Sequence, residues 1–569
     1  MSGCDLVLLH APHVYDFRKE TILYGPVSDL VPATPVFEMY PFGLISIAEY
    51  LERAGYRVRI VNLAGRMLND KNFDPEKLIK RLEAQVFGID LHWLVHAHGA
   101  VEVAKLVKKY HPEAKVVMGG FSASYFYKEL FNYPEIDYVL RGDSTEEPLR
   151  QLIDSVNKRQ PPEEVPNLVW RDDRGKIQEN PFSHIPDDIS NVMLDHYTGI
   201  IRSVIRHRDL ASIIPFKGWL RYPVTAVFTC RGCNHNCVIC GGSKAAFRTF
   251  LNRDKTVFRS PQDIARDIRS IGRFNNAPIF ILGDIRQPGD DYAHKLLQIL
   301  HKDRVKNQLM LEIFCPASTE FLKNLGLAAT NFCLEISPES HDSEVRRASG
   351  KYYSNEDLEQ TIADALDAGC GRFDLFFMVG LPKQTPQSVM ATVDYCEYLL
   401  DKFRDKRFCL FIGPLAPFLD PGSLAFEKPE RYGYRVLFRT LEEHRQALLA
   451  PSWRYTLNYE TEWMTRHQIM DTTYEAILRL TRLKAKYGLI SRQIAERQEW
   501  RIKAALELEY HIGQIWCRSN HHEDLELLKP QVDEINALRA NERTELELPM
   551  GLRKLKLLPS LWSLVTKKR

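Results

Sequence analysis

The sequence predicts an α/β protein with a doubly wound parallel sheet, a second series that forms a barrel or partial barrel, and a mostly helical C-terminal region. Three observations predict this order. Short apolar runs alternate with helical periodicity over residues 1–157, the alternation resumes over 223–425, and long amphipathic stretches follow over 426–569. Residues 158–222 are rich in turn-forming residues, so we expect a linker with a small hairpin there.

The first series has five strand candidates at residues 5–10, 57–61, 86–89, 115–118 and 137–140, and helix candidates at 42–54 and 97–110. Ligands of doubly wound sheets bind at the carboxyl ends of the strands. The residues placed there are His10, Asp90, His92, Gly119, Gly120 and Gly142.

The linker hairpin is expected from residues 168–170 and 176–178, which flank an Asp-Asp-Arg-Gly turn. The second series has strand candidates at 225–228, 279–282, 311–314, 332–336, 372–379 and 408–411. Six such units, separated by helices such as 261–271 and 355–368, indicate parallel strands in a barrel or part of one. Helices are then expected at 472–487 and 490–508.

Composition excludes several classes of protein. The 569 residues carry 76 Lys+Arg and 74 Asp+Glu, a net charge of +2, which argues against a nucleic-acid binder that works through bulk charge. No signal peptide is expected at the start, and no uncharged apolar run reaches the roughly 18 residues of a membrane span. We therefore expect a cytoplasmic protein, in which clustered thiols are more often metal ligands than disulfides.

Three of the 11 cysteines stand out by spacing: Cys233, Cys237 and Cys240 form C-x3-C-x2-C directly after a predicted strand. Three thiolates on one loop suit an iron–sulfur cluster or zinc. A closed zinc site needs a fourth ligand, for which Cys230 or His235 could serve. The remaining alternative is three incidental core cysteines.

This spacing at the start of a barrel-like series resembles the radical SAM superfamily. The resemblance implies a partial (β/α)6 TIM barrel and a [4Fe–4S] cluster on Cys233, Cys237 and Cys240, with S-adenosylmethionine on its open iron as the source of a 5′-deoxyadenosyl radical. Segments in matching order imply further S-adenosylmethionine contacts, which are Gly283, Asp284, Glu339, Arg346, Met378 and Gly380. The turn reads Leu-Gly-Asp where the family has a Gly-Gly-Glu-like sequence.

The first series resembles the Rossmann-like cobalamin-binding domain of one radical SAM subgroup, through Tyr40-Pro-Phe-Gly43, Val117-Met-Gly-Gly120 and Arg141-Gly-Asp143. The implied cobalamin-binding residues are His10, His92, Gly119, Gly120, Ser122 and Gly142. His92 could lie under cobalt or could only cap a helix. A degenerate domain that has lost cobalamin is the other alternative.

The resemblance implies a cobalamin-dependent radical SAM enzyme that methylates an unactivated carbon of a small-molecule or lipid substrate. It further implies an electron donor such as flavodoxin or ferredoxin, whereas the balanced charge argues against a nucleic-acid partner. The alternatives are a radical ring rearrangement or cyclisation, and a zinc-stabilised binding protein without catalysis. Residues 551–569 mix basic and apolar side chains, so this tail could dock onto protein or associate weakly with a membrane.

Overall fold

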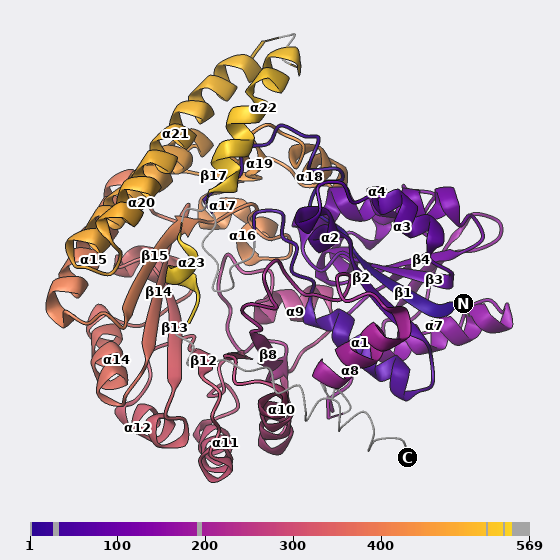
Figure 1. The fold of residues 1–569 in the computed structure, drawn as a ribbon, viewed down its shortest axis with the longest axis horizontal. Helices are drawn as coiled ribbons and strands as arrows, with labels where there is room; N and C mark the ends of the chain where they lie inside the picture. Colours follow the sequence, from indigo (N-terminus) through magenta and orange to yellow (C-terminus); the bar gives the residue numbers. More distant parts are fainter. Residues whose placement is uncertain (1–2, 27–33, 191–195, 519–521, 539–540, 549–569) are drawn as a thin grey trace.

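The structure, a computed structural model, describes residues 3–26, 34–190, 196–518, 522–538 and 541–548. Two α/β units lie side by side, and C-terminal helices run along the outer side of the second unit (Figure 1). The predicted fold class is confirmed by this arrangement. The tail at residues 551–569 lies outside the described residues, so its two interpretations stay predictions.

The first sheet has the order β2-β1-β3-β4-β5-β6-β7, with β1 to β5 parallel. Its parallel strands are β1 (Cys4–His10), β2 (Val58–Asn62), β3 (Ala84–Asp90), β4 (Lys115–Gly119) and β5 (Tyr138–Leu140). Its helices are α1 (Phe42–Arg53), α2 (Leu63–Asn69), α3 (Pro75–Arg81), α4 (Ala97–Tyr110), α5 (Phe121–Tyr125), α6 (Tyr127–Leu130) and α7 (Glu146–Lys158). Alternate residues of β1 enter the cores on opposite faces of the sheet, which explains its uninterrupted apolar run.

The predicted hairpin forms, but it is part of the first sheet. β6 (Leu168–Arg171) pairs antiparallel with β5, and β7 (Ile177–Glu179) pairs with β6. The hairpin covers the outer edge of β5, whose backbone N–H and C=O groups would otherwise lack partners. Residues 158–222 are therefore a linker only in their second half, which holds α8 (His196–His207).

The second unit is an open sheet of six parallel strands in the order β15-β14-β13-β12-β11-β8. These strands are β8 (Thr225–Phe228), β11 (Ile279–Leu282), β12 (Leu309–Glu312), β13 (Phe332–Glu339), β14 (Arg372–Val379) and β15 (Phe408–Pro414). A short ribbon of β9 (Cys230–Arg231) and β10 (Val257–Phe258) follows β8. The sheet is a partial barrel, as predicted.

The barrel helices are α9 (Lys244–Phe250), α10 (Pro261–Phe274), α11 (Asp290–Asp303), α12 (Thr319–Ala328), α13 (Ser343–Ala348), α14 (Asn355–Asp367) and α15 (Pro386–Phe403). Several start at classical caps. Ser260 accepts a hydrogen bond from Asp263 N and precedes a proline at the first position of α10. Thr385 forms a capping box with Ser388 at the start of α15.

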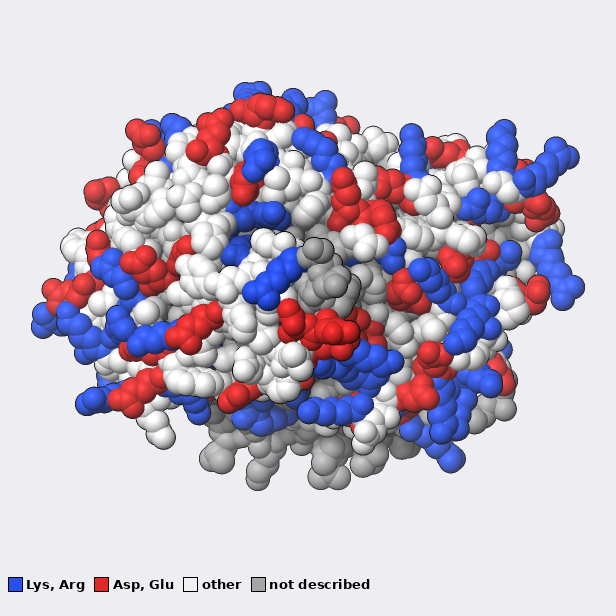
Figure 2. Space-filling model, turned by 90° about the horizontal axis from the view of Figure 1, so that it is seen from above, with Lys and Arg blue, Asp and Glu red and all other residues white. Residues whose placement is uncertain are grey.

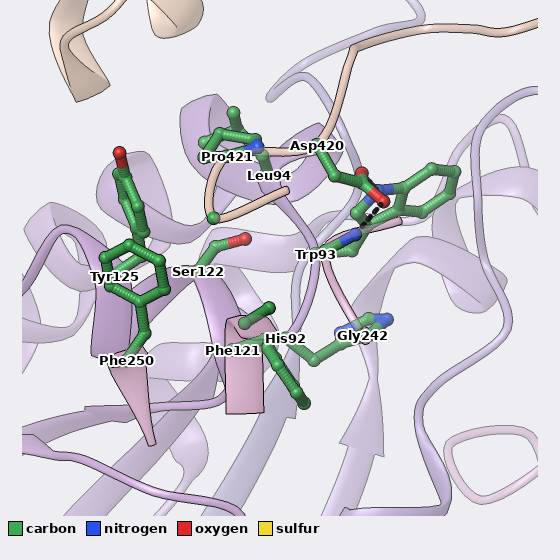
Figure 3. Close-up of a pocket in the computed structure, with 13 residues that line it drawn as sticks. His92, Trp93, Leu94, Phe121, Ser122, Tyr125, Gly242, Phe250, Asp420 and Pro421 are labelled. Atoms are coloured by element: carbon green, nitrogen blue, oxygen red, sulfur yellow. Dashed lines mark hydrogen bonds between the residues drawn. The ribbon is translucent and has the colours of Figure 1, made fainter. Parts of the chain in front are cut away.

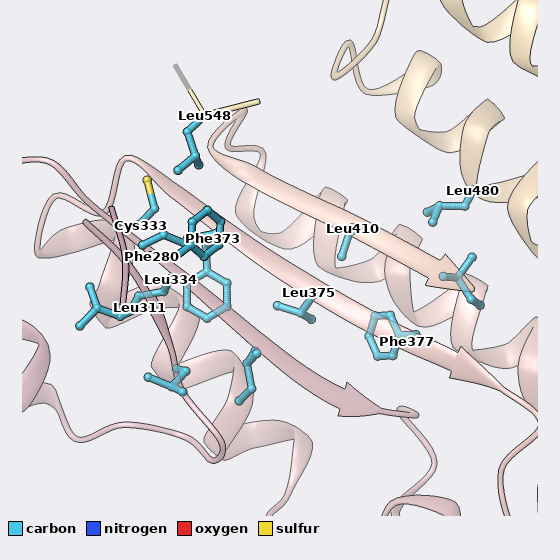
Figure 4. Close-up of a cluster of buried hydrophobic side chains, with 14 of the residues drawn as sticks. Phe280, Leu311, Cys333, Leu334, Phe373, Leu375, Phe377, Leu410, Leu480 and Leu548 are labelled. Atoms are coloured by element: carbon cyan, nitrogen blue, oxygen red, sulfur yellow. The ribbon is translucent and has the colours of Figure 1, made fainter. Parts of the chain in front are cut away.

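The C-terminal region contains α16 (Leu424–Glu427), α17 (Pro429–Tyr432), β16 (Tyr434–Val436), α18 (Leu441–Ala447), α19 (Trp453–Thr456), β17 (Tyr459–Thr461), α20 (Arg466–Lys486), α21 (Arg492–Trp516), α22 (His522–Ala537) and α23 (Arg543–Leu546). α20 packs against α15 and β15 at one edge of the open sheet. Leu548 is buried beside Phe280, Cys333 and Phe373, near the amino-terminal ends of the barrel strands (Figure 4).

Lys and Arg side chains are interspersed with Asp and Glu on the face seen in Figure 2, in keeping with the small net charge. Within the described residues, no helix combines the length and apolar character that crossing a membrane would require.

Candidate functional site

Three cysteines lie on one loop at the carboxyl edge of the barrel. After the β9 strand, the chain passes Cys233, Cys237 and Cys240 before α9 begins. Gly232 opens this loop with φ +98°, and a Cβ on it would lie 3.0 Å from Thr256 Cα. The glycine therefore permits the turn that directs the cysteines over the end of the barrel.

Backbone N–H groups donate to two of the three sulfurs. His235 N lies 3.4 Å from Cys233 Sγ, and Gly242 N lies 3.3 Å from Cys240 Sγ. Burial raises the pKa of the Cys233 and Cys237 thiols, so metal binding would release their protons. Thiol sulfurs supported by N–H donors fit an iron–sulfur cluster. In the described part of the chain, no three His, Cys, Asp or Glu side chains gather closely enough to hold a single metal ion.

The turn after β11 carries Gly283 and Asp284. Gly283 has φ +90°, and its N–H donates to Glu312 Oε2 at 2.8 Å. Asp284 is buried, and both of its carboxylate oxygens accept hydrogen bonds, from Arg286 and from Phe314 N at 2.9 Å. Asp284 thus fixes the shape of the turn. Glu312, at the carboxyl end of β12, is the carboxylate that contacts Gly283. The sequence predicted this strand at 311–314, two residues late, so Glu312 was not recognised as a strand-end carboxylate.

Glu339 ends β13 with φ +68° and pairs with Lys351 Nζ at 2.8 Å through Oε1. Its Oε2 is buried and has no hydrogen-bond partner among the described residues, so one carboxylate oxygen is left without a partner. Burial opposes the charge of Lys351, but attraction to Glu339 outweighs it and raises the pKa of the ammonium. Arg346 is fully buried and donates to Ser340 O at 3.0 Å and Tyr353 O at 2.9 Å, so it holds the loop that carries this pair.

The end of β14 is held by the C-terminal region. Gly380 has φ +101°, and a Cβ on it would lie 2.2 Å from Tyr459 Oη. Gly380 N donates to Gln384 Oε1 at 2.8 Å, and Gln384 Nε2 donates to Met378 O at 2.9 Å. Tyr434 Oη donates to Gly380 O at 3.0 Å. The mouth of the barrel is therefore shaped by residues beyond the predicted barrel domain.

Two histidines share one buried carboxylate at the carboxyl edge of the first sheet. His10 Nδ1 lies 3.0 Å from Asp90 Oδ1, and His92 Nδ1 lies 2.7 Å from Asp90 Oδ2. Burial alone would raise the pKa of Asp90, but attraction to His10 and the hydrogen bonds from both rings lower it. A carboxylate in its ionised form only accepts, so each Nδ1 is the donor. His92 makes no capping bond, because the turn that follows has Trp93 at its N-cap.

Each of the other residues predicted at this edge has its own surroundings. Gly120 has φ +115°, and a Cβ on it would lie 2.5 Å from His92 Cα, so only glycine allows this close approach. The carbonyl of Gly119 accepts from Leu91 N at 2.8 Å. Ser122 lines the cavity described next, whereas Gly142 does not line it and has its N–H bound to a serine hydroxyl.

A cavity of about 290 Å³ lies between the first sheet and the cysteine loop. Its lining includes His92 and Trp93 after β3, Ser122 on α5, Gly241 and Gly242 from the cysteine loop, and Asp420 after β15. Figure 3 shows Asp420 facing Trp93, whose Nε1 lies 3.3 Å from Oδ1, and Asp420 Oδ2 accepts from Gly241 N at 3.2 Å. Burial raises the pKa of Asp420. Asp420 was not among the residues predicted from the sequence, although it opens an Asp-Pro-Gly turn in the loop after the last barrel strand.

Ion pairs fix the first sheet against the barrel beside the cysteine loop. Arg253 Nε lies 2.5 Å from Asp143 Oδ2, and Arg231 Nη1 lies 3.2 Å from Glu146 Oε2. All four side chains are largely buried. The Arg-Gly-Asp segment after β5, predicted near a ligand through Gly142, thus makes an inter-unit contact.

Comparison with known proteins gives two family matches. Residues 29–152 match the B12 binding domain, and residues 227–396 match the radical SAM superfamily. The chain is 26% identical over 285 residues to the hopanoid C-3 methylase of Methylococcus capsulatus, covering 49% of each chain. It is 26% identical over 268 residues to the anaerobic magnesium-protoporphyrin IX monomethyl ester cyclase of Synechocystis, covering 46% of this chain and 48% of the relative. The chain thus spans about half the length of these curated relatives.

Among solved structures, the chain resembles the radical S-adenosylmethionine methyltransferase TsrM from Kitasatospora setae, solved with cobalamin and a [4Fe–4S] cluster. The TM-score is 0.57 at 14% identity, over 94% of this chain and 100% of that one, which shows a shared fold. Both predicted domain types are confirmed, in the predicted order. The chain therefore carries a B12 binding domain followed by a radical SAM domain, which is the combination that the sequence resemblance implied.

Proposed function

We propose that this chain is a cobalamin-dependent radical SAM methyltransferase that acts on an unactivated carbon. The observation that carries the proposal is one cavity with His92 on one wall and the cysteine loop on the other. The hopanoid methylase and TsrM support methyl transfer by their names. When bound, the cluster with S-adenosylmethionine supplies a hydrogen-abstracting radical, and cobalamin supplies the methyl group.

The barrel residues hold and orient the first pair of cofactors. Cys233, Cys237 and Cys240 are the proposed cluster ligands. We propose that Glu339, through its unpartnered Oε2, and Glu312 bind the cationic amino group of S-adenosylmethionine, because both carboxylates lie at carboxyl ends of barrel strands. Glu312 also accepts from the turn glycine, Gly283. Met378 and Gly380 are proposed beside the adenine. For Asp284 and Arg346 we propose positioning roles, which their hydrogen bonds within the protein support.

His92 is the residue that we propose beneath cobalt. Its Nδ1 is held by Asp90, which leaves Nε2 as the ring nitrogen for a metal, and its side chain is 30% exposed at the cavity. Carboxylates commonly orient metal-binding histidines in this way. Gly120 and Ser122 would contact the same cofactor from β4 and α5. In cobalt(II)-loaded protein we expect nitrogen hyperfine structure in the electron paramagnetic resonance spectrum, which His92→Ala should remove. An unchanged spectrum in that variant contradicts the assignment.

Anaerobic reconstitution tests the function. With iron, sulfide and cobalamin, the protein should take up all three, and with S-adenosylmethionine and a reductant it should form 5′-deoxyadenosine and S-adenosylhomocysteine. Cys237→Ser should lose the iron, whereas the matched Cys230→Ser, outside the triplet, should keep it. Zinc without iron would support a zinc-stabilised binding protein, and protein that binds neither cobalamin nor S-adenosylmethionine would overturn the proposal.

The second candidate is radical cyclisation or ring rearrangement, favoured by the cyclase relative. Formation of 5′-deoxyadenosine without S-adenosylhomocysteine, and a product without an added methyl mass, would select it. Both candidates need an electron donor such as flavodoxin or ferredoxin, which we propose as the physiological partner, together with a small-molecule or lipid substrate.

A further inference from the structure

A second and larger cavity, of about 550 Å³, lies between the C-terminal helices and the part of the first unit formed by α2 and the segment after β1. It shares no lining residue with the cavity beside the cysteine loop. Its walls include Arg501 on α21, Asn536 on α22, Lys71 after α2, Lys217 before β8, and Tyr24 and Phe37 from the segment after β1. A cavity of this size falls within the range of about 300–1,000 Å³ for small-molecule sites.

Arg501 is the unusual feature of this cavity. The residue is 3% exposed, its Nε donates to Leu538 O at 3.0 Å, and its Nη1 is buried without a hydrogen-bond partner. No carboxylate among the described residues pairs with it, and burial lowers the pKa of the guanidinium. A buried cation without a counter-ion is costly. A cavity beside that cation offers room for an anion to offset the cost.

The acids on the cavity wall do not neutralise its cations. Asp533 is already paired with a lysine of its own helix at 3.0 Å. Among the cations, Arg18 is paired with Asp16 at 2.7 Å. Lys71 and Lys217 are exposed and form no ion pair within the described residues, which leaves Glu20 as the remaining acid on the wall. Positive charge is therefore in excess.

The rest of the cavity is suited to an apolar body. A smaller cavity of about 50 Å³ adjoins it and shares Ile22, Tyr24, Gly25, Pro35 and Phe37 with it. That smaller cavity is lined by Pro414, at the carboxyl end of β15. The two cavities thus lead from Arg501 toward the mouth of the barrel.

We infer that Arg501 binds an anionic group of the substrate, a phosphate, phosphonate or carboxylate, and that the apolar part of the substrate lies along Tyr24 and Phe37 toward the barrel. The identification of the ligand as the substrate rests on the proposed function, whereas anion binding by Arg501 does not. Lys71 and Lys217 would attract the anion to the cavity, because exposed charges act mainly on association.

Calorimetric titration of the full chain without cofactors tests the inference. Because no cofactor is needed, the result does not depend on successful reconstitution of the cluster or cobalamin. Hexyl phosphate should bind, hexanol should not, and inorganic phosphate should bind more weakly than hexyl phosphate. In Arg501→Met the affinity for hexyl phosphate should fall roughly tenfold to a hundredfold, as for a charged hydrogen bond. Arg501→Lys should recover part of it, and Lys503→Met, on the exposed side of the same helix, should change nothing.

Stability separates a binding role from a structural one. Arg501→Met should unfold at the same temperature as the wild type or higher, because it removes a buried unpaired charge. Tighter binding of glycerol phosphate than of lysophosphatidic acid would indicate a soluble substrate, and the reverse a lipid headgroup. Equal binding of hexyl phosphate and hexanol, equal affinity in Arg501→Met, or loss of hexyl phosphate binding in cobalamin-loaded protein would overturn the inference.

Discussion

The Asp143→Asn substitution tests the contact between the first sheet and the barrel. Arg253 is 2% exposed, and its guanidinium lies 2.5 Å and 3.0 Å from the two carboxylate oxygens of Asp143. Its other acceptors are neutral: Pro186 O at 3.2 Å and Ser144 Oγ at 3.3 Å. An asparagine would keep one oxygen acceptor but remove the counter-ion.

The expected cost follows from these contacts. Removing one partner of a buried ion pair costs about 3–5 kcal/mol. Three neutral acceptors would still face Arg253, so we expect the lower end, about 3 kcal/mol, or roughly a hundredfold in the equilibrium that docks the two units. The loss of stability should be found in the segments around the ion pair, which are β9, β10 and residues 183–190.

Hydrogen exchange followed by mass spectrometry measures the loss of stability at these segments, and the first transition in denaturant unfolding measures the loss for the whole chain. The matched control is Asp254→Asn on the same loop, because the Arg248–Asp254 pair is 74% and 72% exposed and should contribute less than about 1 kcal/mol. Adding Arg253→Met to Asp143→Asn should recover much of the loss. If Asp143→Asn exchanges no faster than Asp254→Asn, the buried pair does not hold the units together.

Two further predictions concern buried groups. Burial raises the pKa of Glu509 from 4.5 to about 7, so the folded protein keeps a proton that the unfolded chain releases. Wild-type stability should therefore fall by up to about 3 kcal/mol as pH rises from about 4.5 to about 7. Urea unfolding at pH 5 and pH 8 should show this fall largely absent in Glu509→Gln, and parallel pH profiles would refute it. Gly120→Ala should lower stability by about 2–4 kcal/mol in thermal unfolding, through strain and collision with His92. Gly55 also has a positive φ, but a Cβ on it would meet no atom within 4 Å, so Gly55→Ala should lower stability less. Equal losses of stability in the two variants would refute the collision with His92.

Local patterns were the part of the fold and site that sequence could predict. The α4 helix matches its expected range because apolar periodicity is a property of one segment, and the three cysteines were found because they share one loop. The β6 and β7 hairpin was predicted as a hairpin, but no local signal placed it on the edge of β5.

The missing parts of the site come from distant segments. Asp420 follows the last barrel strand and meets Trp93 and Gly241, which lie far apart in the chain. Asp284 shows the converse limit. Its place in a motif suggested a ligand contact, which stays a prediction, and no local pattern indicated that Arg286 and Phe314 donate to both of its oxygens.

The burial of Leu548 against Phe280, Cys333 and Phe373 has a consequence for biosynthesis. At about 5–20 residues per second, a ribosome needs roughly 10–35 s to pass from Phe373 to Leu548. During that interval the nascent barrel lacks a side chain that belongs to its hydrophobic core. The chain is therefore expected to depend on chaperones during synthesis, and shortened versions that stop before α23 should aggregate even though every barrel strand is present.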